Sequence, residues 1–288
     1  MKQRILSALV AVLLFVTVLF VSDKYIIIFN CMVSILTAVS VGEIFLATKF
    51  FNYKPLLIAS IVFAAFVPFT NFEVIAPYFG LVIFGYIVFM LATMLRKRHE
   101  IPLREFSLLF MLTALISFAF NILVVLRDMG FDGVGGMWKR DGVFLLLVAC
   151  CCSWLADTGA YFFGRFLGKH KLCPEISPKK TVEGFIGGIV CNVAGMIAIA
   201  YGYQELFSAN AKVNLPLIGV IALFGALLGT LGDLSASYIK RSCNIKDFGN
   251  IMPGHGGVMD RFDSILLVAP MVYLIVSACM DVWPIIVR

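Results

Sequence analysis

Long apolar runs separated by short polar segments make up most of this 288-residue chain. An apolar run of about 20 residues is long enough to cross the hydrocarbon core of a bilayer as an α-helix. The candidate spans are 5–22, 25–48, 55–71, 74–95, 105–126, 142–167, 182–202, 214–239 and 261–284. The pattern therefore predicts an all-α, polytopic integral membrane helical bundle with about nine transmembrane helices.

The positions of the basic residues favour one orientation. If the N-terminus is cytoplasmic, 17 of the 23 Lys and Arg residues fall in inside segments and six fall outside. Membrane proteins keep an excess of Lys and Arg in their cytoplasmic loops. We therefore expect a cytoplasmic N-terminus, with the polar loops 168–181 and 240–260 both on the cytoplasmic side.

Composition supports the membrane class and excludes several others. Hydrophobic residues make up 61% of the chain and charged residues only 14%, which is outside the usual range for soluble domains. The net charge of +6 reflects the Lys and Arg residues that set the orientation of the spans, and the sequence contains no nucleic-acid motif. We expect residues 1–141 to form a transmembrane scaffold of five spans and residues 142–288 to form a catalytic transmembrane region of four.

A charged stripe marks the first candidate site. Asp233 lies inside the span 214–239, where insertion scales give an Asp at the helix centre a cost of roughly 2.5–3.5 kcal/mol. Ser237, Lys240 and Arg241 follow at helical spacing and share a face with it. The stripe suits a cation and a phosphate group. An internal salt bridge from Asp233 to a basic residue is the alternative.

The second candidate site is a glycine-rich segment. Residues 253–257 read Pro-Gly-His-Gly-Gly and precede Asp260, Arg261 and Asp263 at the start of the last span. Glycines let backbone N–H groups approach a ligand closely, and a helix N-terminus favours anions. The segment therefore resembles a phosphate cradle. The two aspartates could instead be first-turn acids that balance the helix dipole.

The third candidate site is the polar loop before the span 182–202. Lys179 and Lys180 could hold a polyphosphate, or they could be orientation charges of a cytoplasmic loop. Thr181 is placed to cap the following helix. Upstream, Asp157 lies within the span 142–167, where a carboxylate indicates function or pairing.

Taken together, these residues suit chemistry at a phosphorus centre. Carboxylate oxygens without a matching His or Cys set favour Mg²⁺ or Mn²⁺ over zinc. A bound divalent cation neutralises phosphate charge, and nearby Lys and Arg residues hold the oxyanions.

From Ser237 to Asp263 the sequence resembles the signature of the membrane-integral phosphatidate cytidylyltransferases, also called CDP-diglyceride synthetases. The matching residues are Ser237, Lys240, Arg241, Lys246, Asp247, Gly249, Pro253, His255, Gly256, Gly257, Asp260, Arg261 and Asp263. Met252 stands where Leu, Ile or Phe is usual. The stretches 157–161 and 177–184 also look like this family, so the resemblance covers roughly the C-terminal half.

The resemblance implies condensation of CTP with phosphatidic acid to give CDP-diacylglycerol and pyrophosphate. It implies a Mg²⁺ cofactor on Asp233 and Asp260, and it leaves open a monovalent cation beside it. The residues that it assigns to catalysis are Asp233, Asp260, Lys240, Arg241, Asp247 and His255. Those that it assigns to substrate binding are Asp157, Ser177, Lys179, Lys180, Ser237, Lys246, Gly256, Gly257, Arg261 and Asp263.

Two alternatives remain open. A CTP-dependent lipid kinase of the dolichol or phytol kinase type would transfer the γ-phosphate to an alcohol, and a transporter of an anionic substrate could also place Asp157 and Asp233 in the membrane. CDP-alcohol phosphatidyltransferases are excluded because Asp132-Gly133 lacks their continuation. We expect a bacterial inner-membrane protein with its active site facing the cytoplasm, membrane lipids as partners and a homodimer as a candidate assembly.

Overall fold

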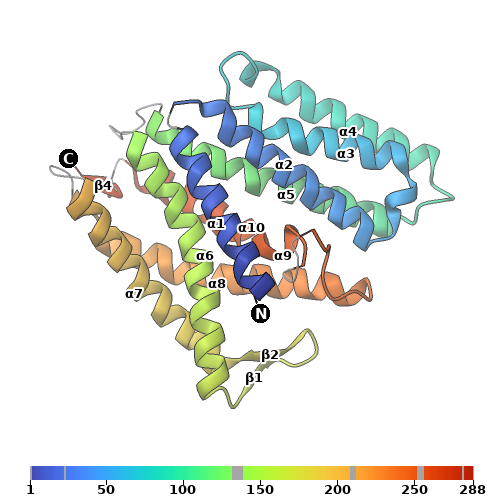
Figure 1. Cartoon of the computed structure of the whole chain (residues 1–288). Coiled ribbons are helices and arrows are strands. Elements are labelled where there is room, and N and C mark those ends of the chain that lie inside the picture. Colours follow the sequence, from blue (N-terminus) through green and yellow to red (C-terminus); the bar gives the residue numbers. More distant parts are fainter. Residues whose placement is uncertain are drawn as a thin grey trace. The chain divides into compact units, whose positions relative to one another are not determined.

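The computed structural model describes residues 2–22, 24–131, 139–207, 212–251, 256–280 and 282–287 (Figure 1). Its α-helices are α1 (Lys2–Ser22), α2 (Ile26–Ala47), α3 (Lys54–Phe66), α4 (Phe79–Arg96), α5 (Leu103–Phe131), α6 (Lys139–Leu167), α7 (Val182–Phe207), α8 (Leu215–Ser242), α9 (Met259–Phe262) and α10 (Ile265–Cys279). Short 3₁₀ helices are η1 (Phe50–Asn52), η2 (Val67–Phe69) and η3 (Ala76–Tyr78). The strands are β1 (Lys171–Cys173), β2 (Ser177–Thr181), β3 (Lys212–Val213) and β4 (Ile286–Val287).

Each predicted span coincides with a helix in the described part of the chain. The described helices that are long and apolar enough to cross a membrane are Ile26–Ala47, Ala76–Arg96, Leu103–Met129, Asp141–Leu167, Val182–Leu206 and Leu215–Ser242. The shorter apolar helices are Leu13–Ser22, Lys54–Phe69 and Ile265–Cys279. The prediction of an all-α polytopic membrane protein is confirmed. The number of helices that cross the membrane and the side of the N-terminus stay predictions.

The chain forms two compact units. The first unit combines Met1–Val124 with Ser242–Phe262, and the second combines Val125–Arg241 with Asp263–Arg288. Each unit is therefore built from one long stretch and one shorter segment that lies later in the chain. The division predicted between residues 141 and 142 stays a prediction.

In the first unit, α2 packs against α1 and α3. Asn30 on α2 is 1% exposed, and its Nδ2 donates to the carbonyl of Pro68 at 2.7 Å. Ser34 Oγ donates to the carbonyl of Ala65 at 2.7 Å. These carbonyls belong to the end of α3 and to η2, where Pro68 cannot continue the helical hydrogen bonds. The polar side chains of α2 thus satisfy backbone groups that the helix end leaves open.

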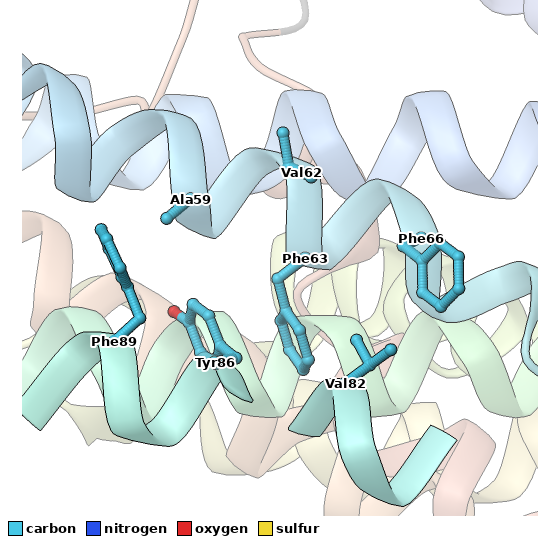
Figure 2. A pocket seen from close by; sticks show the side chains of 7 residues that line it. All are labelled: Ala59, Val62, Phe63, Phe66, Val82, Tyr86 and Phe89. Atoms are coloured by element: carbon cyan, nitrogen blue, oxygen red, sulfur yellow. The ribbon is translucent and has the colours of Figure 1, made fainter. Parts of the chain in front are cut away.

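A pocket of about 350 Å³ lies between α3 and α4 of this unit (Figure 2). Its lining residues are Ala59, Val62, Phe63, Phe66, Val82, Tyr86 and Phe89. Phe63 stacks on Tyr86 with ring centroids 4.1 Å apart, and the Tyr86 hydroxyl lies 3.0 Å from Ser60 Oγ. The stacked rings join the two helices, and the pocket contains none of the predicted site residues.

In the second unit, α6 packs along α7, and α10 packs against α6. A Cβ at Gly188 would lie 2.8 Å from the carbonyl oxygen of Ala156, so glycine is required for this close helix approach. Asn192 on α7 is buried, and its Nδ2 donates to the carbonyl of Ala222 on α8 at 2.8 Å. These contacts fix α6 and α8, which carry Asp157 and Asp233.

A β-hairpin connects α6 to α7, where the sequence predicts a polar loop (Figure 1). Strands β1 and β2 pair antiparallel, with Lys171 opposite Thr181. Glu183 on α7 ties the base of the hairpin, because its carboxylate accepts the N–H of Lys169 at 3.0 Å and lies 2.6 Å from Nδ1 of His170. Thr181 Oγ1 accepts the N–H of Gly184 at 3.1 Å, so the predicted cap of α7 is confirmed.

The orientation of the second unit is testable with cysteine probes at the two ends of α7. Lys171 precedes this 26-residue helix and Lys212 follows it, and a helix of that length spans about 39 Å. We expect Lys171→Cys to resist a membrane-impermeant thiol reagent in intact cells and Lys212→Cys to react. Labelling at position 171 from outside would overturn the expected orientation.

The loop after α8 needs an engineered probe for the same experiment. Burial raises the pKa of the Cys243 thiol, with Lys49 opposing the shift, and a raised pKa disfavours the reactive thiolate. Asn250 is exposed, and Asn250→Cys supplies a better site. We expect it to be protected in intact cells and labelled after the membrane is permeabilised.

Candidate active site

Asp233 on α8 binds two of the predicted site residues. Its Oδ2 forms an ion pair with Nζ of Lys180 from the hairpin, and its Oδ1 accepts a hydrogen bond from Ser237 Oγ at 3.4 Å. The spacing of Asp233 and Ser237 on one helix face is confirmed. The predicted alternative, an internal salt bridge from Asp233 to a basic residue, is also realised. Since its partner Lys180 is itself a candidate phosphate ligand, the ion pair joins two predicted sites.

Asp263 lies in the turn between α9 and α10 and is buried. Its Oδ2 is 4.0 Å from Nζ of Lys240, and its Oδ1 accepts the N–H of Ser264 at 2.9 Å. Gly232 on α8 allows this approach, because a Cβ there would lie 2.7 Å from the carbonyl oxygen of Asp263. The glycine before Asp233 thus lets the turn that carries Asp263 contact α8.

Asp157 on α6 is the third carboxylate in this region. Its side chain is exposed, and its Oδ2 accepts a hydrogen bond from Ser264 Oγ at 3.1 Å. Ser264 therefore links Asp157 to the turn that holds Asp263. We call Asp157, Asp233 and Asp263, together with Lys180 and Lys240, the carboxylate cluster.

The carboxylate cluster has an excess of negative charge. Its three carboxylates outnumber its two lysines and repel one another. A divalent cation would offset this repulsion, and carboxylate oxygens are the donors that Mg²⁺ prefers. Within the described residues, however, no three or more His, Cys, Asp or Glu side chains are grouped so that they alone could hold a metal ion. Substrate oxygens would have to complete the coordination.

The two candidate lysines of the hairpin differ in burial and in partners. Lys179 and Lys180 are adjacent on β2, whose burial does not alternate strictly along the strand. Lys179 is exposed, whereas Lys180 is partly buried and paired with Asp233. Ser177, on the same strand, is also partly buried. The two lysines therefore have different environments, which their adjacent positions in the sequence do not reveal.

In the first unit, Asp260 binds backbone groups. Its Oδ2 accepts the N–H of Phe248 at 2.8 Å and the N–H of Gly257 at 3.0 Å. Gly256 has φ +90°, a conformation that favours glycine. The next N–H groups, of Val258 and Met259, bind a carboxylate from α2. The N–H groups of residues 257–259 therefore donate to carboxylates of the protein itself. The predicted phosphate cradle did not include these contacts.

The other predicted residues lie on exposed positions or outside the described ranges. Arg241 of the second unit is exposed, as are Lys246, Asp247 and Arg261 of the first unit. His255 lies outside the residues that the structure describes. Their assigned roles stay predictions.

Sequence reasoning missed Glu43, Gly232 and Ser264. Glu43 is a lone carboxylate in an apolar run, which was the signal available for it. Gly232 and Ser264 are ordinary residue types for a membrane helix and a helix start, so their roles follow only from the tertiary contacts.

The close contact at Gly232 gives a stability prediction. Gly232→Ala places a methyl group against the Asp263 backbone, and overpacking of this kind costs about 1–3 kcal/mol. Gly229→Ala is the matched control one turn away, where a Cβ meets only ordinary contacts of 3.4 Å and longer. We expect Gly232→Ala alone to lower the melting temperature of the purified protein in detergent. Equal melting temperatures for the two variants would contradict the described packing.

Comparison with known proteins places the chain in a family. Proteins named phosphatidate cytidylyltransferase from Staphylococcus haemolyticus (strain JCSC1435) and Staphylococcus aureus (strain COL) are each 42% identical over 154 residues, which are 52% of this chain and 57% of the relative. The protein of that name from Staphylococcus saprophyticus is 40% identical over the same length. The chain thus spans about half the length of the curated relatives that it matches. The model of the cytidylyltransferase family matches residues 2–279, and this chain belongs to that family.

Proposed function

We propose that this protein transfers the cytidylyl group of CTP to phosphatidic acid, giving CDP-diacylglycerol and pyrophosphate. The observation that carries the proposal is the carboxylate cluster, in which Lys180 and Asp233 bring the hairpin and α8 together. Family membership and the names of the Staphylococcus relatives support the same reaction. The proposal also places the protein in a bacterial inner membrane with this cluster facing the cytoplasm.

The reaction needs one bond to form and one to break at the α-phosphorus of CTP. An oxygen of the phosphatidic acid phosphate attacks this phosphorus, and the bond to the oxygen that bridges to the β-phosphorus breaks. Pyrophosphate leaves with the electron pair of that bond. A Mg²⁺ ion held by Asp233 and Asp260, when bound, would neutralise the phosphate charge that opposes this attack.

The residues of the carboxylate cluster hold and orient the charged groups in this scheme. Lys180 would exchange its contact with Asp233 for a phosphate oxygen of CTP once the nucleotide binds. Lys240 is buried beside Asp263, so its ammonium group is fixed near the same carboxylates. Asp157 and Ser264 hold the turn before α10 in place.

One assay of purified protein with labelled CTP, phosphatidic acid and Mg²⁺ tests the proposal. We expect CDP-diacylglycerol and pyrophosphate as products. A phosphorylated lipid with CDP would identify a lipid kinase instead, and substrate flux into liposomes without turnover would identify a transporter.

Removing either proposed metal ligand tests the cation site. We expect Asp233→Asn and Asp260→Asn each to lower kcat by at least about 100-fold, since losing a direct ligand should cost at least as much as losing its outer-shell partner. The double variant should be little worse than either single one, because the two act as a unit.

The matched control is Asp141→Asn. Asp141 is a buried carboxylate on α6, bonded to the hydroxyl of Tyr203 at 2.7 Å, and about 24 Å of helix separates it from Asp157. This variant should retain activity. If the two site variants fold and turn over like the control, the metal assignment is wrong.

The two hairpin lysines give a second, paired test. Lys180→Arg and Lys179→Arg both keep the positive charge, but the guanidinium group is larger and planar. We expect Lys180→Arg to lower kcat/KM for CTP by about 10-fold or more, the loss of roughly one charge-assisted hydrogen bond. Lys179→Arg, on the exposed face, should change it less than about twofold. Equal kinetics for both variants would mean that the hairpin serves only as a charged cytoplasmic loop.

A further inference from the structure

Glu43 is a buried carboxylate in a membrane helix and belongs to no recognised motif. It lies near the C-terminal end of α2 and is 1% exposed. A carboxylate in such a position is costly unless the structure supplies partners, so its partners indicate why it is there.

Those partners are two consecutive backbone groups directly after the glycine-rich segment. Glu43 Oε1 accepts the N–H of Val258 at 2.9 Å, and its Oε2 accepts the N–H of Met259 at 2.8 Å. Both oxygens act as acceptors, which suits an ionised carboxylate. More than 200 residues separate Glu43 from these groups in sequence, so the contact joins two distant segments of the first unit.

Two glycines make room for this carboxylate. A Cβ at Gly257 would lie 2.4 Å from Glu43 Oε1, and a Cβ at Gly249 would lie 2.4 Å from the same atom. In both cases the nearest atoms all belong to Glu43. The requirement for small residues at these positions is therefore explained by a side chain from α2.

The same segment carries Asp260, which follows Met259 directly. Asp260 accepts the N–H groups of Phe248 and Gly257, so its carboxylate ties together the two ends of the stretch 248–257. Glu43 binds the two residues between Gly257 and Asp260. The backbone on the N-terminal side of Asp260 is thus held by two carboxylates, one of them from another helix.

We propose that Glu43 is a positioning residue that holds the segment 257–259 and thereby sets the position of Asp260. This inference rests on the proposed function, in which Asp260 is a ligand of the divalent cation. Glu43 itself touches neither the cation nor the substrates in this scheme. Its effect on the reaction passes through the backbone of Val258 and Met259.

Glu43→Gln is the sharpest single change, because it keeps the size of the side chain and replaces one acceptor oxygen with an NH₂ group. That group faces a backbone N–H and cannot accept from it. Asn30→Ala is the matched control, since Asn30 is on the same helix, is equally buried and donates to Pro68 instead. Both variants lose a buried hydrogen bond of α2, but only the bond of Glu43 reaches the segment 257–259.

Three measurements on the full-length protein in detergent separate positioning from general stability. Hydrogen exchange followed by mass spectrometry should show at least about tenfold faster exchange in peptides covering 245–262 for Glu43→Gln and unchanged exchange there for Asn30→Ala. Mn²⁺ binding without substrates, followed by electron paramagnetic resonance, should weaken by about 10-fold for Glu43→Gln only. The Mg²⁺ concentration for half-maximal activity should rise by a similar factor.

A double-variant cycle tests the contact itself. Gly257→Ala should weaken Mn²⁺ binding strongly in the natural background, because its methyl group displaces the Glu43 carboxylate. In the Glu43→Asp background the carboxylate is one methylene shorter, so Gly257→Ala should add little further loss. Additive effects would show that Glu43 and Gly257 act independently and would overturn the inference.

The outcomes distinguish this inference from the proposed function. If the natural protein makes no CDP-diacylglycerol, the proposed function fails, whereas hydrogen exchange and the Gly257 cycle still decide whether Glu43 holds the segment. If the protein is active and Glu43→Gln matches Asn30→Ala in exchange, Mn²⁺ binding and Mg²⁺ dependence, Glu43 is only a structural residue and the inference is wrong.

Discussion

The organisation of this protein depends on how carboxylates are accommodated in an apolar helical chain. Burying an isolated carboxylate costs several kcal/mol, whereas hydrogen bonds to charged groups contribute about 1.5–3 kcal/mol each. The two units meet this constraint differently. In the second unit, Asp233 and Asp263 pair with lysine side chains, which can exchange ligands, and Asp263 also accepts the N–H of Ser264. In the first unit, Glu43 binds backbone N–H groups, which remain fixed while the fold persists.

Lysine partners are suited to binding a substrate, whereas backbone N–H partners are suited to holding a segment of the chain in place. An ammonium group on a flexible stem can move from Asp233 to a phosphate oxygen, because both acceptors are anionic oxygens. A backbone N–H bonded to Glu43 cannot move in this way without local unfolding of the segment. The lysine partners of the carboxylate cluster therefore suit substrate exchange, and the Glu43 contacts suit a rigid support.

The sequence predicted features that depend on helical periodicity and missed those that depend on tertiary contacts. The spans and the Asp233–Ser237 spacing follow from repeats along one helix, and the Thr181 cap is a local signal. The pairing of Lys180 with Asp233 joins a hairpin to a distant helix, which no local pattern encodes. The hairpin has no clear strand pattern in the sequence, because β1 has only three residues and β2 contains Pro178 and two lysines. Glu43 was passed over because its partners lie more than 200 residues further along the chain.

The glycine-rich segment shows why a motif needs its structural context. Glycines near a helix N-terminus expose N–H groups, and such groups suit any anion, whether phosphate or carboxylate. Here Gly257, Val258 and Met259 donate to Asp260 and Glu43, so the anions are part of the protein. In the proposed reaction, side chains such as Lys180 and Lys240 would then hold phosphate, while the N–H groups of residues 257–259 hold the backbone that carries Asp260. The N–H groups of residues 257–259 can therefore support phosphate chemistry without contacting phosphate themselves.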